Sequence, residues 1–214
     1  MSSAALLAFA GVALLCVATP VPTTLLALSN GSRFGLRAAL PGMAGAVASD
    51  FLLMAAAAAG LSTLVAASAS AFAVVKWLGV AYLAYLGGRL LQAPATPRSL
   101  APGRAPYCPP SSFAMFLRSF LVAATNPKAY LFFAALLPQF VDPAQPQVAQ
   151  YAVLALIFGT LDLVTMIGYA MAGERATRVF DAASTRVRID RACGATMLLL
   201  ATSLALLRRQ PSGI

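Results

Sequence analysis

Residues 38–61 read AALPGMAGAVASDFLLMAAAAAGL, and Asp50 is the only charged side chain in this stretch. An α-helix needs about 20 mostly apolar residues to cross a hydrocarbon core of about 30 Å, and this stretch is long enough. Its many alanines and glycines suit a helix that packs closely against others. The stretch therefore predicts a membrane-spanning helix with one carboxylate inside the bilayer, where a charged group is costly and commonly functional.

The whole chain has the composition of a membrane protein. Of its 214 residues, 60% are hydrophobic and 10% are charged, and the mean hydropathy is +0.82. This is too apolar for a water-soluble globular domain. The 15 Lys and Arg against 6 Asp and Glu give a net charge of +9, but the cations lie between apolar stretches and form no patch. A nucleic-acid partner is therefore not expected.

Charge-poor runs of the right length occur along the chain and predict six transmembrane helices. The expected spans are residues 4–28, 38–61, 71–88, 113–138, 148–172 and 192–207. The last run is short for a crossing, so a five-span protein is the alternative. A cleaved signal peptide fits the first run poorly. The run is too long, and no positively charged side chain precedes it, since the first charged side chain of the protein is Arg33.

Arginines mark alternate connections and predict the orientation. They follow the first, third and fifth expected spans: Arg33 and Arg37; Arg89, Arg98, Arg104 and Arg118; Arg175, Arg178, Arg186, Arg188 and Arg191. Cations in short loops mark the cytoplasmic side, so we expect a cytoplasmic (inner) membrane protein with both termini outside the cytoplasm. Arg208 and Arg209 disagree with this orientation unless the last run does not cross.

A proline-rich segment divides the chain into two similar parts. Residues 92–112 contain six prolines: Pro94, Pro97, Pro102, Pro106, Pro109 and Pro110. This composition predicts an extended cytoplasmic connector between residues 1–91 and 113–214. Three spans on each side is an odd number, so the two parts must cross in opposite directions. The expected fold is an all-α integral membrane protein with six transmembrane helices arranged as two inverted three-helix repeats.

Each part opens with a span that prolines interrupt. The first span contains residues 19–22 (TPVP), and the fourth contains residues 125–128 (TNPK). Proline removes a backbone donor and clashes with the preceding turn, so both helices should be broken there, leaving carbonyl groups that a cavity can use. Interrupted spans at corresponding places in inverted halves point to a transporter site near the midplane. The alternative is that these prolines only shape helix packing.

Three charged residues fall well inside the expected spans: Asp50, Lys128 and Asp162. Lys128 can compensate one aspartate, which leaves the other able to take up and release a proton. Such a group is what coupling to a proton gradient requires. The alternative is a fixed structural ion pair without a role in transport. Lys76 is different, because it lies near a span end beside Trp77 and is expected to anchor the helix at the interface.

Five segments are informative together: residues 19–22 (TPVP), 32–38 (SRFGLRA), 76–87 (KWLGVAYLAYLG), 126–129 (NPKA) and 137–141 (LPQFV). In this order they resemble the LysE/RhtB family of amino-acid exporters. The resemblance covers nearly the whole chain. It implies a six-helix inner-membrane exporter of amino acids or their derivatives, driven by proton exchange. The family's first motif usually reads Pro-Gly-Pro followed by Asn, whereas this chain has Val21 and Thr23 at those two places.

The resemblance and the charges together predict a site that binds a zwitterion. The candidate substrate-binding residues are Pro20, Pro22, Thr23, Thr24, Asn126, Pro127 and Lys128, and the candidate proton-coupling residues are Asp50 and Asp162. The prolines hold the helix breaks open, and the threonines and asparagine offer hydrogen bonds. Lys128 faces the substrate carboxylate or holds an aspartate. The expected partners are an amino acid, protons and the lipid bilayer, and the sequence leaves association between copies of the chain open.

Two other classes of function are weaker. A cation or metal-ion exporter would have mainly hard oxygen ligands here, because the chain has no histidine and its cysteines, Cys16, Cys108 and Cys193, are scattered. A membrane-embedded enzyme would need a nucleophile or metal with an activating base, and the sequence offers only isolated aspartates. We therefore expect no catalytic residue, no metal site and no cofactor.

Overall fold

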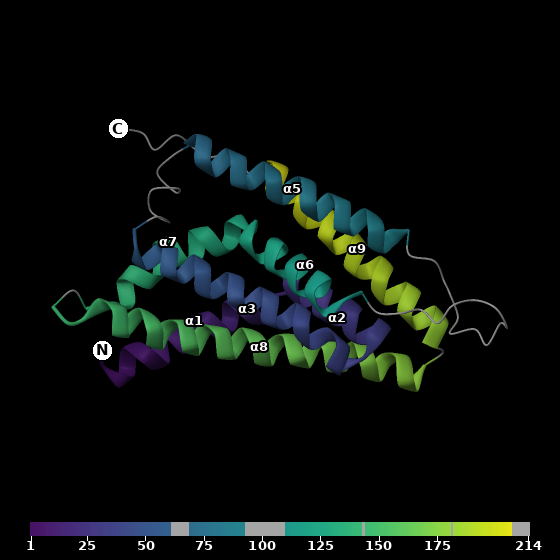
Figure 1. Cartoon of the computed structure of the whole chain (residues 1–214), viewed down its shortest axis with the longest axis horizontal. Helices are drawn as coiled ribbons and strands as arrows, with labels where there is room; N and C mark the ends of the chain where they lie inside the picture. The colour runs from purple at the N-terminus through teal and green to yellow at the C-terminus, as the bar shows by residue number, and fades with distance from the viewer. Residues whose placement is uncertain (61–68, 93–109, 143, 181, 207–214) are drawn as a thin grey trace.

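The computed structural model describes residues 1–60, 69–92, 110–142, 144–180 and 182–206, and its regular structure there is entirely α-helical (Figure 1). The helices are α1 (Ser3–Ala18), α2 (Pro22–Phe34), α3 (Leu36–Ala58), α5 (Ala69–Leu91), α6 (Ser112–Ala124), α7 (Pro127–Phe140), α8 (Gln147–Val179) and α9 (Ala182–Leu206). The expected all-α class is confirmed for these residues. Most of the predicted connector lies outside them, as do Arg98, Arg104, Cys108, Arg208 and Arg209.

Both predicted helix breaks are present. Between Ala18 and Pro22 the chain leaves the helix, and α1 and α2 are bent by 59° relative to each other. Pro22 is the first residue of α2, where proline's missing N–H costs nothing and its fixed φ suits the helix. The second break separates Ala124 of α6 from Pro127 of α7. Proline thus ends one helix and starts the next in both parts of the chain.

Three of the described helices are long and apolar enough to cross a membrane: α3, α8 and residues 184–206 of α9. The bent pair of α1 and α2 makes a fourth candidate if it is one span. Six spans in inverted repeats stay a prediction. The sequence placed two boundaries wrongly, because α8 continues to Val179 and α9 begins at Ala182 instead of residue 192. Both helices continue beyond their apolar stretches into arginine-rich turns, which hydropathy alone does not recognise as helical.

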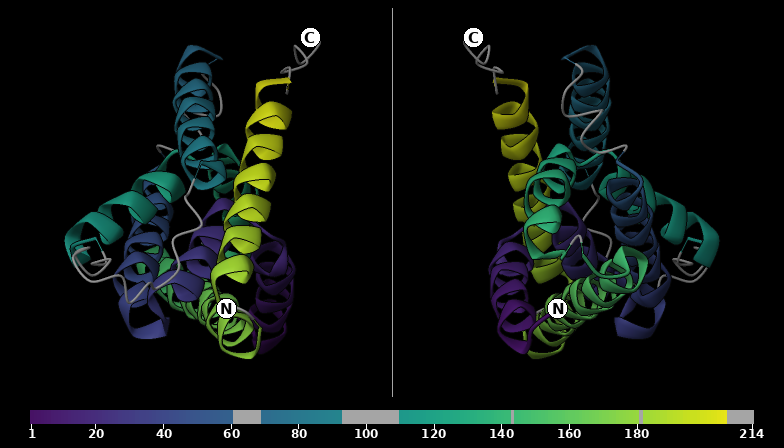
Figure 2. Two further views of the ribbon diagram at one scale, coloured as in Figure 1. Left: turned by 90° about the vertical axis from the view of Figure 1, so that its right-hand side faces the viewer. Right: turned by 90° about the vertical axis from the view of Figure 1, so that its left-hand side faces the viewer.

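Glycines bring the main helix pairs into backbone contact. The closest pairs are α2 with α8, α3 with α6, and α5 with α9, and the last pair runs along one edge of the bundle (Figures 1 and 2). A Cβ atom on Gly45 of α3 would lie 2.1 Å from the Phe116 carbonyl oxygen of α6. One on Gly31 of α2 would lie 2.2 Å from the Ala170 carbonyl oxygen of α8. Only glycine permits such close approach, so these positions fix where the helices cross.

Polar contacts tie the helices together at the end where α8 passes to α9, on the right in Figure 1. Asp190 of α9 pairs with Arg33 of α2 at 2.6 Å and accepts a hydrogen bond from Ser29 at 2.7 Å. Glu174 of α8 accepts a hydrogen bond from the Leu36 backbone N–H at 3.0 Å, at the start of α3. The arginine-bearing ends of several helices therefore gather on one side. That this side faces the cytoplasm stays a prediction.

The glycine contacts can be tested by adding one methyl group. Gly45→Ala should lower the thermal unfolding temperature in detergent, because overpacking a tight contact costs about 1–3 kcal/mol. Gly168→Ala is the matched control, since nothing lies within 4 Å of the added Cβ on α8. The control should be neutral or slightly stabilising, because alanine favours a helix over glycine. Equal unfolding temperatures for the two variants would contradict the α3–α6 contact.

Candidate functional site

A small cavity lies where the two helix breaks meet. Its volume is about 50 Å³. We call it the central cavity, and it is lined by Cys16, Val17, Val21, Thr23, Asp50, Ala123, Asn126, Ala129, Phe132, Phe133, Phe158 and Asp162. Four of these residues are among those singled out from the sequence: Thr23, Asn126, Asp50 and Asp162. The structure therefore brings residues from both halves of the chain to one place.

The two aspartates are the most polar feature of this cavity. Asp50 of α3 is 7% exposed and Asp162 of α8 is 4% exposed. Both side chains line the same cavity, and their carboxyl groups are close enough to interact with each other. A carboxylate only accepts hydrogen bonds, so a bond between two carboxyl groups needs a proton on one of them. Two such groups in contact form an acidic pair that can hold one proton between them.

The other predicted residues divide into three groups. Thr23 and Asn126 line the cavity, one at each helix break. Thr24 is fully buried at the start of α2, where its hydroxyl accepts from the Val21 N–H at 3.0 Å and donates to the Val21 carbonyl at 2.8 Å. It fixes the break and does not line the cavity. Pro20 and Pro22 belong to the same break without lining the cavity, and the side chains of Pro127 and Lys128 lie outside the described residues.

Val21 takes the place of the glycine that the resemblance led us to expect. Its backbone has φ −111° and ψ 162°, an extended conformation that any residue adopts. The valine therefore brings no backbone strain. Its side chain lines the central cavity, so its effect is to occupy space there.

Three phenylalanines that the sequence analysis did not single out form the apolar wall of the central cavity. The rings of Phe132 and Phe133 have centroids 5.6 Å apart, and those of Phe133 and Phe158 are 5.0 Å apart. Phe158 precedes Asp162 by four residues on one helix, so the two share a face. That spacing was the available signal. For the other two rings the sequence gives no sign that separates a cavity wall from an ordinary core.

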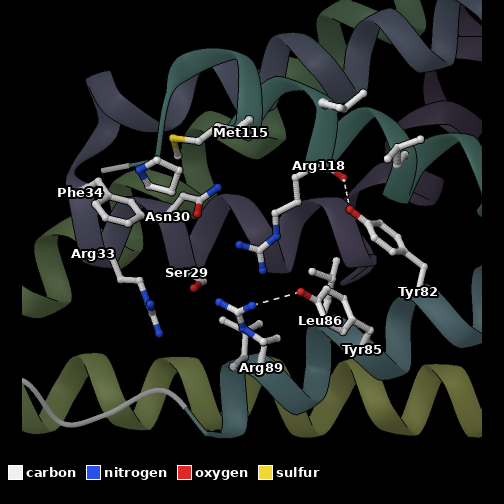
Figure 3. A pocket seen from close by; sticks show the side chains of 15 residues that line it. Ser29, Asn30, Arg33, Phe34, Tyr82, Tyr85, Leu86, Arg89, Met115 and Arg118 are labelled. Carbon is white, nitrogen blue, oxygen red and sulfur yellow. Dashed lines mark hydrogen bonds between the residues drawn. The ribbon is translucent and has the colours of Figure 1, made fainter. Parts of the chain in front are cut away.

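A second, larger cavity lies toward the arginine-bearing end and is shown in Figure 3. Its volume is about 440 Å³. We call it the arginine vestibule, and it is lined by Ser29, Asn30, Arg33, Phe34, Tyr82, Tyr85, Leu86, Arg89, Leu90, Pro110, Ala114, Met115, Leu117, Arg118 and Leu121. The sequence analysis used Arg33, Arg89 and Arg118 only as markers of orientation. The missed signal was that Arg118 lies inside the expected fourth span, where a charged side chain is costly and commonly functional.

Asp190, which the sequence analysis did not consider, is buried next to the arginine vestibule. It is 3% exposed and pairs with Arg33. It lies before the expected start of the last span and among five arginines, so neither hydropathy nor charge pattern distinguishes it. Among the described residues, no group of three or more histidine, cysteine, aspartate or glutamate side chains is placed to hold a metal ion.

The apolar helices define a multi-pass membrane protein with a polar cavity at two interrupted helices. The chain belongs to the LysE type translocator family, whose family model matches residues 6–208. It is 33% identical over 195 residues to the homoserine/homoserine lactone efflux protein of Salmonella typhimurium, covering 86% of this chain and 92% of that protein.

Two further relatives are similar over most of their length. The leucine efflux protein of Klebsiella pneumoniae is 33% identical over 168 residues, which is 78% of this chain and 77% of that protein. An uncharacterized membrane protein of Vibrio cholerae is 31% identical over 195 residues, which is 87% of this chain and 91% of that protein. No solved structure matches the chain.

A double-mutant cycle tests the contact between the two aspartates. Asp50→Leu or Asp162→Leu alone leaves one buried carboxyl group without its partner, which costs about 1–3 kcal/mol of unfolding free energy. The double variant should cost less than the sum of the two, by about 0.5–3 kcal/mol. Unfolding in detergent at one fixed pH measures all four proteins.

The matched control pairs Asp50→Leu with Asp190→Leu, because Asp190 lies in a separate ion pair with Arg33. These two changes should add to within about 0.5 kcal/mol. Additive losses for Asp50 with Asp162 would show that the two carboxyl groups do not interact.

Proposed function

We propose that this protein is a secondary transporter that exports amino acids or their derivatives across the cytoplasmic membrane by proton antiport. The observation that carries the proposal is the acidic pair of Asp50 and Asp162 in a cavity between two interrupted helices. The family and two relatives, the homoserine/homoserine lactone efflux protein and the leucine efflux protein, support the substrate class. An inner-membrane location is part of the same proposal.

The residues of the central cavity suit the charged and polar groups of an amino acid. The substrate ammonium would lie against Asp50 and Asp162, which are acceptors when ionised. Thr23 and Asn126 would donate hydrogen bonds to the substrate carboxylate from the two helix breaks. Lys128 is the second residue of α7, which begins at Pro127 directly after Asn126, and we propose that its ammonium faces this carboxylate or holds one of the aspartates.

Coupling to protons follows from competition for the same carboxyl groups. Two carboxylates in contact repel each other, so without substrate the pair retains a proton. A bound ammonium neutralises the second charge and allows that proton to leave. Substrate and proton therefore occupy the pair alternately, and a cycle that carries substrate outward returns protons inward.

Alternating access requires the central cavity to change size. Its volume of about 50 Å³ is far below the roughly 300–1,000 Å³ of typical ligand pockets, so this conformation is closed around the aspartates. Leu26 of α2 and Val122 of α6, which are 1% and 2% exposed, lie in one apolar cluster with residues of α5 and α9. The bend between α1 and α2 is the place where one segment can move while the other stays packed.

The rival functions are less well supported. A metal-ion exporter would have to bind its cargo with two carboxylates and neutral oxygens in the central cavity. An enzyme would sit outside a family of translocators. Measuring the transport of an amino acid and of a metal ion in the same assay decides between the first rival and our proposal.

Transport can be measured in inside-out vesicles with an acidic interior. The wild-type protein should accumulate labelled leucine or homoserine. Asp50→Asn or Asp162→Asn should lower the gradient-driven rate at least about tenfold, because an acidic pair with one carboxamide cannot exchange its proton normally. Asp142→Asn is the matched control, since Asp142 lies in the connection between α7 and α8, away from the central cavity, and its hydrogen bonds to Ala144, Gln145 and Gln150 are local. The control should transport as the wild type does.

Collapse of the gradient should stop accumulation by the wild type. Accumulation that persists without a gradient would contradict antiport. Uptake of a divalent metal ion but of no amino acid would favour the rival exporter.

Val21→Gly tests the effect of the valine on substrate size. Because the backbone is already extended, the change should widen the central cavity without relieving strain. We expect the ratio of leucine to alanine transport to rise about two- to tenfold, as one or two methylene groups in a pocket contribute about 1 kcal/mol each. The ratio of the two initial rates measures this. An unchanged ratio would mean that Val21 does not contact the substrate.

A further inference from the structure

We propose that the arginine vestibule binds the carboxylate of an amino acid with an apolar side chain before the molecule reaches the central cavity. This inference rests on the proposed export function and names the substrate class that this chain admits. It assigns a second binding site, at the arginine-bearing end, to residues that lie on α2, α5 and α6.

The cations of the vestibule are not equally neutralised. Arg33 pairs with Asp190 at 2.6 Å. In the part of the chain that the structure describes, no carboxylate lies within ion-pair distance of Arg89 or Arg118. The Nε atom of Arg118 is buried and has no hydrogen-bond partner there. A buried donor of a charged group is costly when unpaired, and an anion in the vestibule would satisfy it.

Two guanidinium groups approach each other in the vestibule. Figure 3 shows Arg89 of α5 and Arg118 of α6 with their charged ends near each other, whereas the Arg33 side chain lines the cavity but extends away from them and pairs with Asp190. Tyr85 accepts a hydrogen bond from Arg89 Nη1 at 3.1 Å, which holds that side chain in place. The planar fork of arginine fits a carboxylate with two parallel hydrogen bonds. The vestibule thus offers an anion both charge and geometry.

The remaining wall is mostly apolar. Leu86 and Leu90 of α5 face Met115, Leu117 and Leu121 of α6 across the vestibule. The volume of about 440 Å³ lies within the range of roughly 300–1,000 Å³ that is usual for small-molecule pockets. An amino acid with an aliphatic side chain can place its carboxylate on the arginines and its side chain on the leucines.

The vestibule and the central cavity lie along the same two helices. On α2, Asn30 lines the vestibule and Thr23 lines the central cavity, and seven residues of helix span about 10 Å. On α6, Leu121 lines the first and Ala123 the second. A substrate whose carboxylate is held by the arginines therefore has a short path inward for its ammonium.

The test is binding of labelled L-leucine to the purified full chain in nanodiscs of phosphatidylcholine, with L-leucinamide as the competitor that lacks the carboxylate. The wild type should prefer leucine over leucinamide at least about tenfold, the effect of one charge-assisted pair. Arg118→Gln should reduce this preference to within about twofold. Arg118→Lys should retain part of it, because the charge remains without the fork. Arg191→Gln, which removes an exposed charge from α9, should leave it unchanged.

A headgroup phosphate of an anionic lipid is the other source of such an anion. Nanodiscs that contain phosphatidylglycerol distinguish binding of a lipid phosphate from binding of an amino-acid carboxylate. The inference is wrong if Arg118→Gln lowers the retention of phosphatidylglycerol but leaves the preference for leucine over leucinamide unchanged, because the binding of both is weakened equally. Arg89→Gln provides the same comparison if Arg118→Gln does not fold. A wild type that binds and transports leucine with no preference over leucinamide overturns this inference and the carboxylate contacts proposed for the central cavity, but not amino-acid export itself. A wild type that neither binds nor transports any amino acid overturns the proposed function as well.

Discussion

The contact between Asp50 and Asp162 is the constraint on which the rest of the structure depends. Two carboxyl groups buried together are stable only when they share a proton or face a cation, because low-dielectric surroundings penalise two like charges. The fold places them there by packing α3 against α8, and it surrounds them with an apolar wall of phenylalanines. The two helix breaks add the polar side chains of Thr23 and Asn126 to the same cavity.

Much of this arrangement follows from the sequence. The prolines at 20, 22 and 127 predict both helix breaks, because proline cannot continue a helix, and the structure has both. Asp50 and Asp162 were found by their position in apolar runs. Their mutual contact was not, since it depends on how α3 and α8 cross, and that crossing depends on the small side chains and close approaches that no local pattern specifies.

The arginine-rich end was the harder part to predict. Positive charge there follows from the orientation rule, which treats every loop cation alike. The structure distinguishes them: Arg33 has a buried acidic partner, whereas Arg118 lines a cavity with an unsatisfied donor. Helices α8 and α9 extend past their apolar stretches into this region, so hydropathy ended α8 too early and began α9 too late. Contacts between helices that are distant in the sequence decide both which arginine has an acidic partner and how far these two helices extend.

The extended backbone at Val21 has a consequence for how this transporter can diversify. A residue with φ −111° can be exchanged for almost any other without disturbing the turn, since Thr24 and Pro22 already fix its shape. Its side chain nevertheless projects into the central cavity. Under the proposed function, position 21 is thus a point at which single substitutions would shift selectivity while the fold is preserved, so divergence in cargo between related chains would not have to await compensating changes elsewhere.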